Sequence, residues 1–246
     1  MSTVTPAGFL PSSTTTRWRL SVAGVLAVLV PLALVAADVM ASRVGPGQDI
    51  LVGLCLVGLL AVVAWLAGLR LDDLGLARWS WAAGLRWGLG AAALVATAYL
   101  AALAITPLRA SVAEVGAPTW SAAMVSALIL IPLGTVVHEE FAFRGVLFGL
   151  LNRRSGRRVA VLGSSAVFGL WHIVPALAAG PTNDAMADAV GEGFGGTALR
   201  LAGTVLITGL GGIVLCELRV RSGSLVAPIL LHWAVNAGGV LFVLLA

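Results

Sequence analysis

The sequence predicts an all-α protein, a polytopic transmembrane bundle of about seven helical spans. Of its 246 residues, 59% are apolar and only 11% are charged, whereas a soluble domain carries about 25% charged residues. The mean hydropathy is +1.02. Such a chain cannot cover its surface with charge, so most of that surface must face lipid.

Seven apolar runs reach the roughly 20 residues that a membrane-spanning helix needs. They occupy residues 20–41, 50–69, 87–106, 121–151, 159–180, 198–217 and 224–246. The fourth run is long, which indicates either a tilted helix or a helix broken near Pro132 and Gly134. A further helix near residues 107–119 would raise the count to eight.

Two segments outside the apolar runs have distinct compositions. Residues 1–16 are rich in Ser, Thr and Pro, which predicts a disordered tail. Residues 70–86 are amphipathic and carry Trp79 and Trp81, two side chains suited to the headgroup level. This stretch is therefore expected to be an interfacial connector.

Arginine placement predicts the topology, because cytoplasmic loops of membrane proteins carry an excess of positive charge. The net charge is +4 and every basic residue is Arg. The arginines lie at the ends of the apolar runs, which suits lipid as a partner and not nucleic acid. Seven spans put eleven of them on one side: Arg17, Arg19, Arg70, Arg78, Arg86, Arg153, Arg154, Arg157, Arg158, Arg219 and Arg221. The other side receives Arg43, Arg109 and Arg200, with the acidic loop of Asp184, Asp188 and Glu192. We expect the N-terminus to be cytoplasmic and the C-terminus to be outside.

A few ionisable or amide side chains lie inside the predicted spans, where each charge costs roughly 2.5–3.5 kcal/mol and usually has a function. They are Glu139, Glu140 and Arg144 in the fourth span, His172 in the fifth, and His232 and Asn236 in the seventh. By contrast, Asp38 and Glu217 lie near span ends and are expected to be interfacial.

The depths of these residues agree. Glu140 and His172 both lie about 20 Å from the arginine-rich turn that joins spans four and five, at 1.5 Å per residue. His232 and Asn236 lie about 16–22 Å from the same face. Three spans therefore offer polar groups at one level of the membrane.

Helical spacing adds detail to this cluster. Glu140 and Arg144 are four residues apart and can pair, and Phe168 is an aromatic neighbour one turn from His172. Glu139 is rotated by about 100° from Glu140, so one glutamate is expected to face the cluster while the other faces a neighbouring helix.

Three motifs carry a resemblance to a known family: HEEFAFRG at 138–145, FGLWH at 168–172 and HWAVN at 232–236. They match the E-E-x-x-x-R, F-x-x-x-H and H-x-x-x-N motifs of the CPBP family of intramembrane proteases. That family includes the type II CAAX prenyl endopeptidases and the Abi proteins linked to bacteriocin immunity. We accordingly divide the chain into the tail at 1–16, N-terminal spans with the connector at 17–119, and a core at 120–246 that resembles the family.

The resemblance implies an intramembrane endopeptidase in a bacterial plasma membrane. Its expected substrate is a peptide or protein, including one that is anchored in the membrane. It implies that Glu139 and His172 activate a water molecule, and that His232 and Asn236 stabilise the oxyanion. Glu140 and Arg144 would support this arrangement, with Phe168 packing beside it. We expect no cofactor. The alternative is a zinc site built from Glu139, His172 and His232, although the H-E-x-x-H zinc motif is absent because Ala142 occupies its second His position.

Two other classes of protein would also bury such residues. A transporter places Glu, Arg and His at the middle of the membrane, and a non-catalytic immunity or scaffold protein could use the same cavity for binding. Taken singly, His172 or Asn236 would more often be an interhelical hydrogen-bonding group than a catalytic one. The catalytic hypothesis therefore depends on their convergence.

Overall fold

The computed structural model describes residues 24–25, 28–37, 39, 48–113, 116–179, 191 and 193–246. Several predictions fall outside these residues: the tail at 1–16, Arg17, Arg19, Asp38, Arg43 and the acidic loop of Asp184, Asp188 and Glu192. Within the described part of the chain, all regular secondary structure is helical. The prediction of an all-α bundle is confirmed.

Each of the seven predicted spans corresponds to a helix. Five helical segments are long and apolar enough to cross a membrane, namely Leu71–Leu103, Trp120–Ser155, Arg157–Ala178, Gly193–Ser222 and Val226–Leu245. The shorter apolar helices Val28–Ala37 and Ile50–Leu66 lie within the first two predicted spans. The chain is therefore an integral, multi-pass membrane protein.

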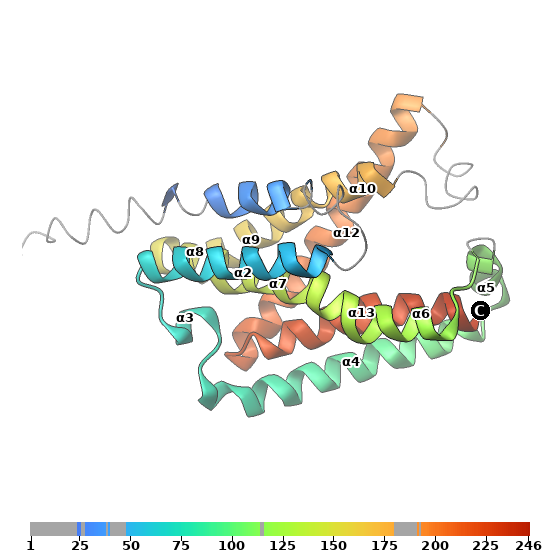
Figure 1. Cartoon of the computed structure of the whole chain (residues 1–246), viewed down its shortest axis with the longest axis horizontal. Helices are drawn as coiled ribbons and strands as arrows, with labels where there is room; N and C mark the ends of the chain where they lie inside the picture. Colours follow the sequence, from blue (N-terminus) through green and yellow to red (C-terminus); the bar gives the residue numbers. More distant parts are fainter. Residues whose placement is uncertain are drawn as a thin grey trace, which may run out of the picture.

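The helices are labelled in Figure 1 in chain order. They are α2 (Gln48–Leu66), α3 (Leu71–Leu74), η1 (Arg78–Ser80), α4 (Trp81–Leu103), α5 (Thr106–Ala113), α6 (Trp120–Val125), η2 (Ser126–Leu130), η3 (Pro132–Val136), α7 (Val137–Glu140), η4 (Phe141–Leu147), α8 (Phe148–Ser155), α9 (Arg157–Trp171), α10 (Ile173–Ala179), α12 (Gly193–Ser222) and α13 (Val226–Leu245). α4 and α13 run side by side, and α9 packs on α12.

Two boundaries differ from the prediction. The connector is shorter than expected, because α4 begins at Trp81 and takes in residues 81–86. The remaining connector is held compact by its own polar atoms: the Trp79 indole donates to Asp72 Oδ1 at 2.9 Å, and the backbone N–H of Arg70 donates to Asp73 at 2.7 Å. Residues 107–119 do not supply an eighth span within the described chain, since α5 has only eight residues.

One end of the bundle brings together three of the arginines that the topology assigned to one side. Arg157 pairs with Glu217 at 2.9 Å, and Arg153 donates to the Gly68 carbonyl at 2.6 Å. Arg219 donates to the carbonyls of Asp72 and Asp73 at 3.1 and 3.0 Å. These contacts tie the connector, the α8–α9 turn and the end of α12 together. Figure 1 shows α3 at this end, with α5 and the C-terminus at the other.

Labelling at the two ends tests the orientation. Ser155 is exposed at the arginine-rich end and Ala246 is exposed at the other. In a background without Cys55 and Cys216, a membrane-impermeant maleimide added outside intact cells should label Ala246→Cys and not Ser155→Cys. Permeabilised cells should label both. Labelling of Ser155→Cys from outside would reverse the predicted orientation.

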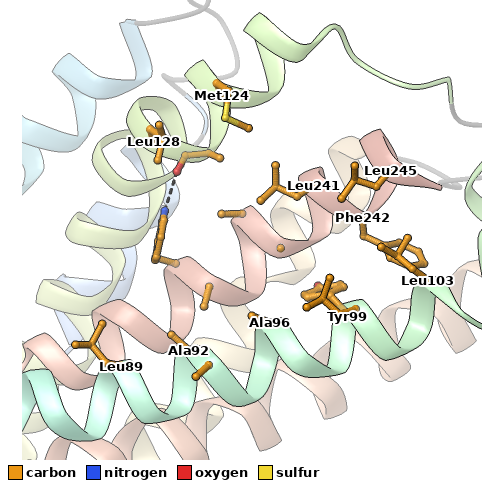
Figure 2. Close-up of a pocket in the computed structure, with 17 residues that line it drawn as sticks. Leu89, Ala92, Ala96, Tyr99, Leu103, Met124, Leu128, Leu241, Phe242 and Leu245 are labelled. Atoms are coloured by element: carbon orange, nitrogen blue, oxygen red, sulfur yellow. Dashed lines mark hydrogen bonds between the residues drawn. The ribbon is translucent and has the colours of Figure 1, made fainter.

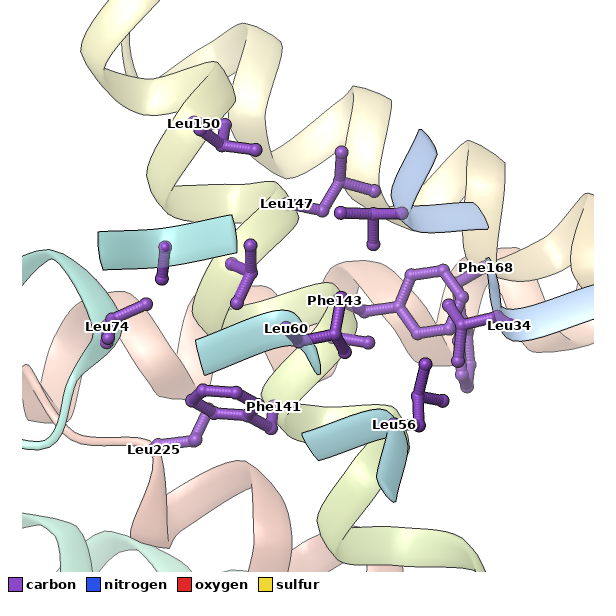
Figure 3. Packing of buried hydrophobic residues seen from close by; sticks show 14 of the residues in the cluster. Leu34, Leu56, Leu60, Leu74, Phe141, Phe143, Leu147, Leu150, Phe168 and Leu225 are labelled. Carbon is purple, nitrogen blue, oxygen red and sulfur yellow. The ribbon is translucent and has the colours of Figure 1, made fainter. Parts of the chain in front are cut away.

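The core lies where the fourth span crosses α2, α9 and the helix Val28–Ala37. Figure 3 shows Phe143 and Leu147 of η4 packed against Leu60 of α2, Phe168 of α9 and Leu34. Phe143 is fully buried, and its ring meets the ring of Phe168 edge-on with centroids 5.0 Å apart. The segment that carries the two glutamates is therefore firmly packed on the side that leads to the arginine-rich α8–α9 turn.

Small residues bring α9 and α12 into close contact. A Cβ atom added at Gly169 would lie 2.7 Å from the Val205 carbonyl oxygen and 3.2 Å from Gly209 Cα. Both neighbours are backbone atoms, so they cannot move aside without shifting the helix. Small residues let backbones approach in membrane helix pairs, where van der Waals packing drives association.

We expect Gly169→Ala to separate α9 from α12 and to lower the melting temperature in detergent. Gly203→Ala on α12 is the matched control, because a Cβ there meets no atom within 4 Å. Alanine favours a helix over glycine by up to about 1 kcal/mol, so the control should be neutral or stabilising. A melting temperature that is unchanged in Gly169→Ala would contradict the close approach.

Candidate active site

The fourth span holds Glu139 and Glu140 between two wide helical turns. The π-helical segments η3 and η4 flank the four-residue α7. Pro132 lacks a backbone N–H and cannot continue a regular ladder, and π-helical turns occur frequently at functional sites. The sequence predicted either a tilted helix or a helix broken near Pro132 and Gly134. The structure has no break there: the helix continues through both residues, with π-helical turns.

Glu140 is the centre of a buried polar network. Its Oε1 atom accepts a hydrogen bond from Arg144 Nη1 at 2.9 Å and one from His232 Nδ1 at 2.8 Å. Glu140 and Arg144 are both 0% exposed. The pairing of Glu140 with Arg144 expected from helical spacing is confirmed, and the network links the fourth span to α13.

Glu139 faces the same imidazole. Its Oε2 atom lies 3.9 Å from His232 Nε2, the ring nitrogen opposite the one that Glu140 binds. The expectation that only one glutamate faces the cluster was wrong. The reason is that His232 lies between the two carboxylates and presents one nitrogen to each.

His172 lies at a break in the fifth span. α9 ends at Trp171 and α10 begins at Ile173, so His172 occupies the turn between them. Pro175 explains the break, because proline removes the hydrogen bond to the carbonyl four residues earlier and its ring clashes with that carbonyl. That carbonyl belongs to Trp171. A continuous span at 159–180 was predicted without this break, although Pro175 was the signal that could have shown it.

The orientation of His172 is fixed by its own helix. Its Nδ1 atom donates to the Phe168 carbonyl at 2.8 Å. A carbonyl only accepts, so this hydrogen bond assigns the proton to Nδ1 and leaves Nε2 with its lone pair. The Phe168 and Trp171 rings meet the imidazole edge-on, with centroids 4.5 and 4.8 Å away.

Phe168 is the common wall of the site. Its ring contacts His172, and His232 meets it edge-on at 6.1 Å. The Arg144 guanidinium carbon lies 4.1 Å from the centre of the same ring, within the range of a cation–π interaction. The ring therefore contacts both His172, which follows the end of α9, and the guanidinium of the Arg144–Glu140 ion pair. This role goes beyond the packing that the sequence predicted.

Asn236 lies one turn beyond His232 on α13 and is half-buried. It makes no hydrogen bond to the residues that the structure describes. Its amide is therefore available to a ligand. Of the six polar residues found from sequence, five belong to the contact network around Phe168 and Glu140, and Asn236 stands at its margin.

Sequence reasoning assigned no role to several residues that shape the site. Trp171 packs against His172, and the Ser164 hydroxyl donates to the Phe143 carbonyl at 2.8 Å, which ties α9 to η4. A Cβ at Gly212 would lie 3.3 Å from Arg144 Nη2, so α12 forms the wall behind the guanidinium. Trp171 stands inside the FGLWH motif and could have been noticed, whereas Gly212 belongs to no motif.

The zinc alternative would use Glu139, His172 and His232. His172 Nδ1 donates to the Phe168 carbonyl and His232 Nδ1 donates to Glu140, so each imidazole could offer only its Nε2 atom to an ion. Among the described residues, no group of three or more His, Cys, Asp or Glu side chains is arranged to hold a metal ion. We therefore derive no chemical step through zinc.

Together, the helical bundle and its buried Glu–Arg–His network define a membrane protein with a polar site enclosed within its spans. Residues 119–238 match the family described as Type II CAAX prenyl endopeptidase Rce1-like. This match confirms the resemblance that the three motifs carry. No curated protein and no solved structure matches the chain.

Proposed function

We propose that this protein hydrolyses a peptide bond inside the membrane with a water molecule activated by Glu139 and His172. The observation that carries the proposal is the convergence of two glutamates and two histidines from three spans on one buried site. The family match supports an endopeptidase of the CAAX type in general.

Glu139 is suited to act as the general base. It is 4% exposed and lies on the same helical segment as Glu140, whose charge is already compensated by Arg144. The lone pair of His172 Nε2 would hold the water, and Glu139 would take its proton as the oxygen attacks the scissile carbonyl. The same proton would then pass to the departing amine, so the base is regenerated.

His232 is suited to stabilise the oxyanion. Glu140 holds its Nδ1–H at 2.8 Å and fixes the ring. With both nitrogens protonated, the ring would present its Nε2–H on the side that faces Glu139, where the scissile carbonyl would lie. A donor that is held in place before the reaction stabilises developing charge without reorganisation. The free amide of Asn236 would be the second donor.

We expect Asn236→Ala to lower kcat for peptide cleavage by about 100- to 1,000-fold, the cost of removing one oxyanion donor. Activity should stay measurable, because the base and His232 remain in place. The assay is peptide release by purified protein in lipid vesicles. Val235→Ala is the matched control, since its side chain is exposed on the same helix. Wild-type kcat in Asn236→Ala would exclude the amide from this role.

A transporter or a non-catalytic scaffold predicts no peptide release by the wild-type protein. The same assay therefore separates these alternatives from the enzyme. The orientation, with the N-terminus in the cytoplasm, and residence in a bacterial plasma membrane remain part of this proposal.

A further inference from the structure

A large apolar cavity lies beside the site on another face of α13. It has a volume of about 580 Å³ and is bounded by α4, α13 and the α6–η2 segment. Figure 2 shows Leu89, Ala92, Ala96 and Tyr99 of α4 on one side, and Leu241 and Phe242 of α13 on another. The volume falls within the roughly 300–1,000 Å³ typical of ligand pockets.

The walls offer no hydrogen-bonding side chain to a ligand. The two polar groups among them are both satisfied within the protein: the Trp233 indole donates to the Ala127 carbonyl at 2.7 Å, and the Tyr99 hydroxyl donates to the Val235 carbonyl at 3.0 Å. All other lining residues are Ala, Leu, Gly, Met or Phe. A peptide backbone in this cavity would bury unsatisfied amides, which is costly. A hydrocarbon chain would need no polar partner.

The length of the cavity matches one leaflet. Along α13 it extends from Trp233 to Leu245, about 18 Å at 1.5 Å per residue. Half of the hydrocarbon core of a bilayer is about 15 Å thick. The cavity reaches Leu245, next to the C-terminus. Figure 1 shows the C-terminus and α5 at the same end of the bundle.

A positive charge lies at that end. Arg109 belongs to α5, which follows the cavity-lining Leu103 at the end of α4. Arg109 is exposed and forms no ion pair with the residues that the structure describes. An anionic headgroup at the membrane surface would complement it.

We propose that this cavity binds one acyl chain of an anionic phospholipid from the leaflet at the α5 end, with the headgroup phosphate near Arg109. The lipid completes the packing between α4 and α6. This lipid site is separate from the proposed peptidase site. The proposal does not depend on whether the protein cleaves peptides.

The test is native mass spectrometry of purified protein titrated with phosphatidylglycerol. The wild type should retain one lipid per chain. Ala96→Phe fills the cavity and should weaken retention by about tenfold or more, because it excludes several methylene groups. Ala92→Leu fills less of the cavity and should also weaken retention of the lipid. It replaces Ala96→Phe in the test if that variant does not fold. Ala101→Phe adds the same ring to an exposed position of α4 outside the cavity and should retain the lipid.

Replacing Arg109 tests the headgroup separately. Arg109→Gln should remove the preference for phosphatidylglycerol over phosphatidylcholine while leaving chain binding in place. The proposal is overturned if the wild type retains no phospholipid, or if the cavity-filling variants retain as much as Ala101→Phe. It is also overturned if only an isoprenoid compound, such as a farnesylated peptide, occupies the cavity.

Discussion

Arg144→Ala should destabilise the protein by about 3–5 kcal/mol, the usual cost of removing one partner of a buried ion pair. Arg144 and Glu140 are both 0% exposed, and they pair at 2.9 Å. The substitution leaves the Glu140 carboxylate uncompensated and opens a space between Phe168 and Gly212. Reversible unfolding in mixed micelles measures the loss.

Arg157→Ala is the matched control for this prediction. Arg157 pairs with Glu217 at the same distance of 2.9 Å, but its side chain is 57% exposed. Exposed pairs contribute about 0–1 kcal/mol, so this variant should unfold almost as the wild type does. An equal loss of unfolding free energy in the two variants would show that the buried ion pair stabilises the protein no more than the exposed one. It would contradict the proposal that this pair holds His232 in place.

Glu139→Gln should abolish peptide cleavage while the protein stays folded. Glutamine keeps the shape of the side chain and can still hydrogen-bond, but it cannot take a proton from water. His172→Ala should be as severe, because the water loses its second contact. The double variant should be little worse than either single one, since residues that act as a unit are not additive. Cleavage rates of the three variants in vesicles test this.

Glu217→Gln is the control for the glutamate substitution. Glu217 lies at the arginine-rich end and, among the described residues, pairs with Arg157 and Arg221 and with no other. It should cleave at the wild-type rate. If the loss of cleavage rate in the double variant equals the product of the two single losses, Glu139 and His172 act independently. That result would contradict a water molecule shared by the two residues.

The sequence was sufficient to predict the bundle because spanning helices need only length and apolarity, and both can be read directly from the chain. It also predicted the common depth of Glu140, His172 and His232, since a helix rises by a constant 1.5 Å per residue. Depth does not determine rotation, however. Two adjacent glutamates about 100° apart both face His232 because its ring lies between their carboxylates, and the position of α13 against the fourth span cannot be read from the helical period.

Other features depend on contacts between segments far apart in the chain. The approach of α12 to Arg144 depends on Gly212, and nothing in the local sequence connects this glycine to the motifs. The tautomer of His172 follows from a carbonyl four residues earlier, but only once the helix is known to end at Trp171. The apolar cavity is lined by three helical segments that are far apart in the sequence, so no single stretch of the chain could predict it.

The most direct test is cleavage of a farnesylated CAAX-type peptide by the wild-type protein, purified, depleted of metal with a chelator and reconstituted in lipid vesicles. Product peptides are identified by mass spectrometry, with Glu139→Gln as the blank. We predict that the metal-depleted protein cleaves the peptide at the untreated rate and that added zinc does not increase it. No cleavage after depletion, with activity restored by zinc, would contradict the metal-free mechanism, and cleavage by the folded Glu139→Gln protein would contradict the site itself.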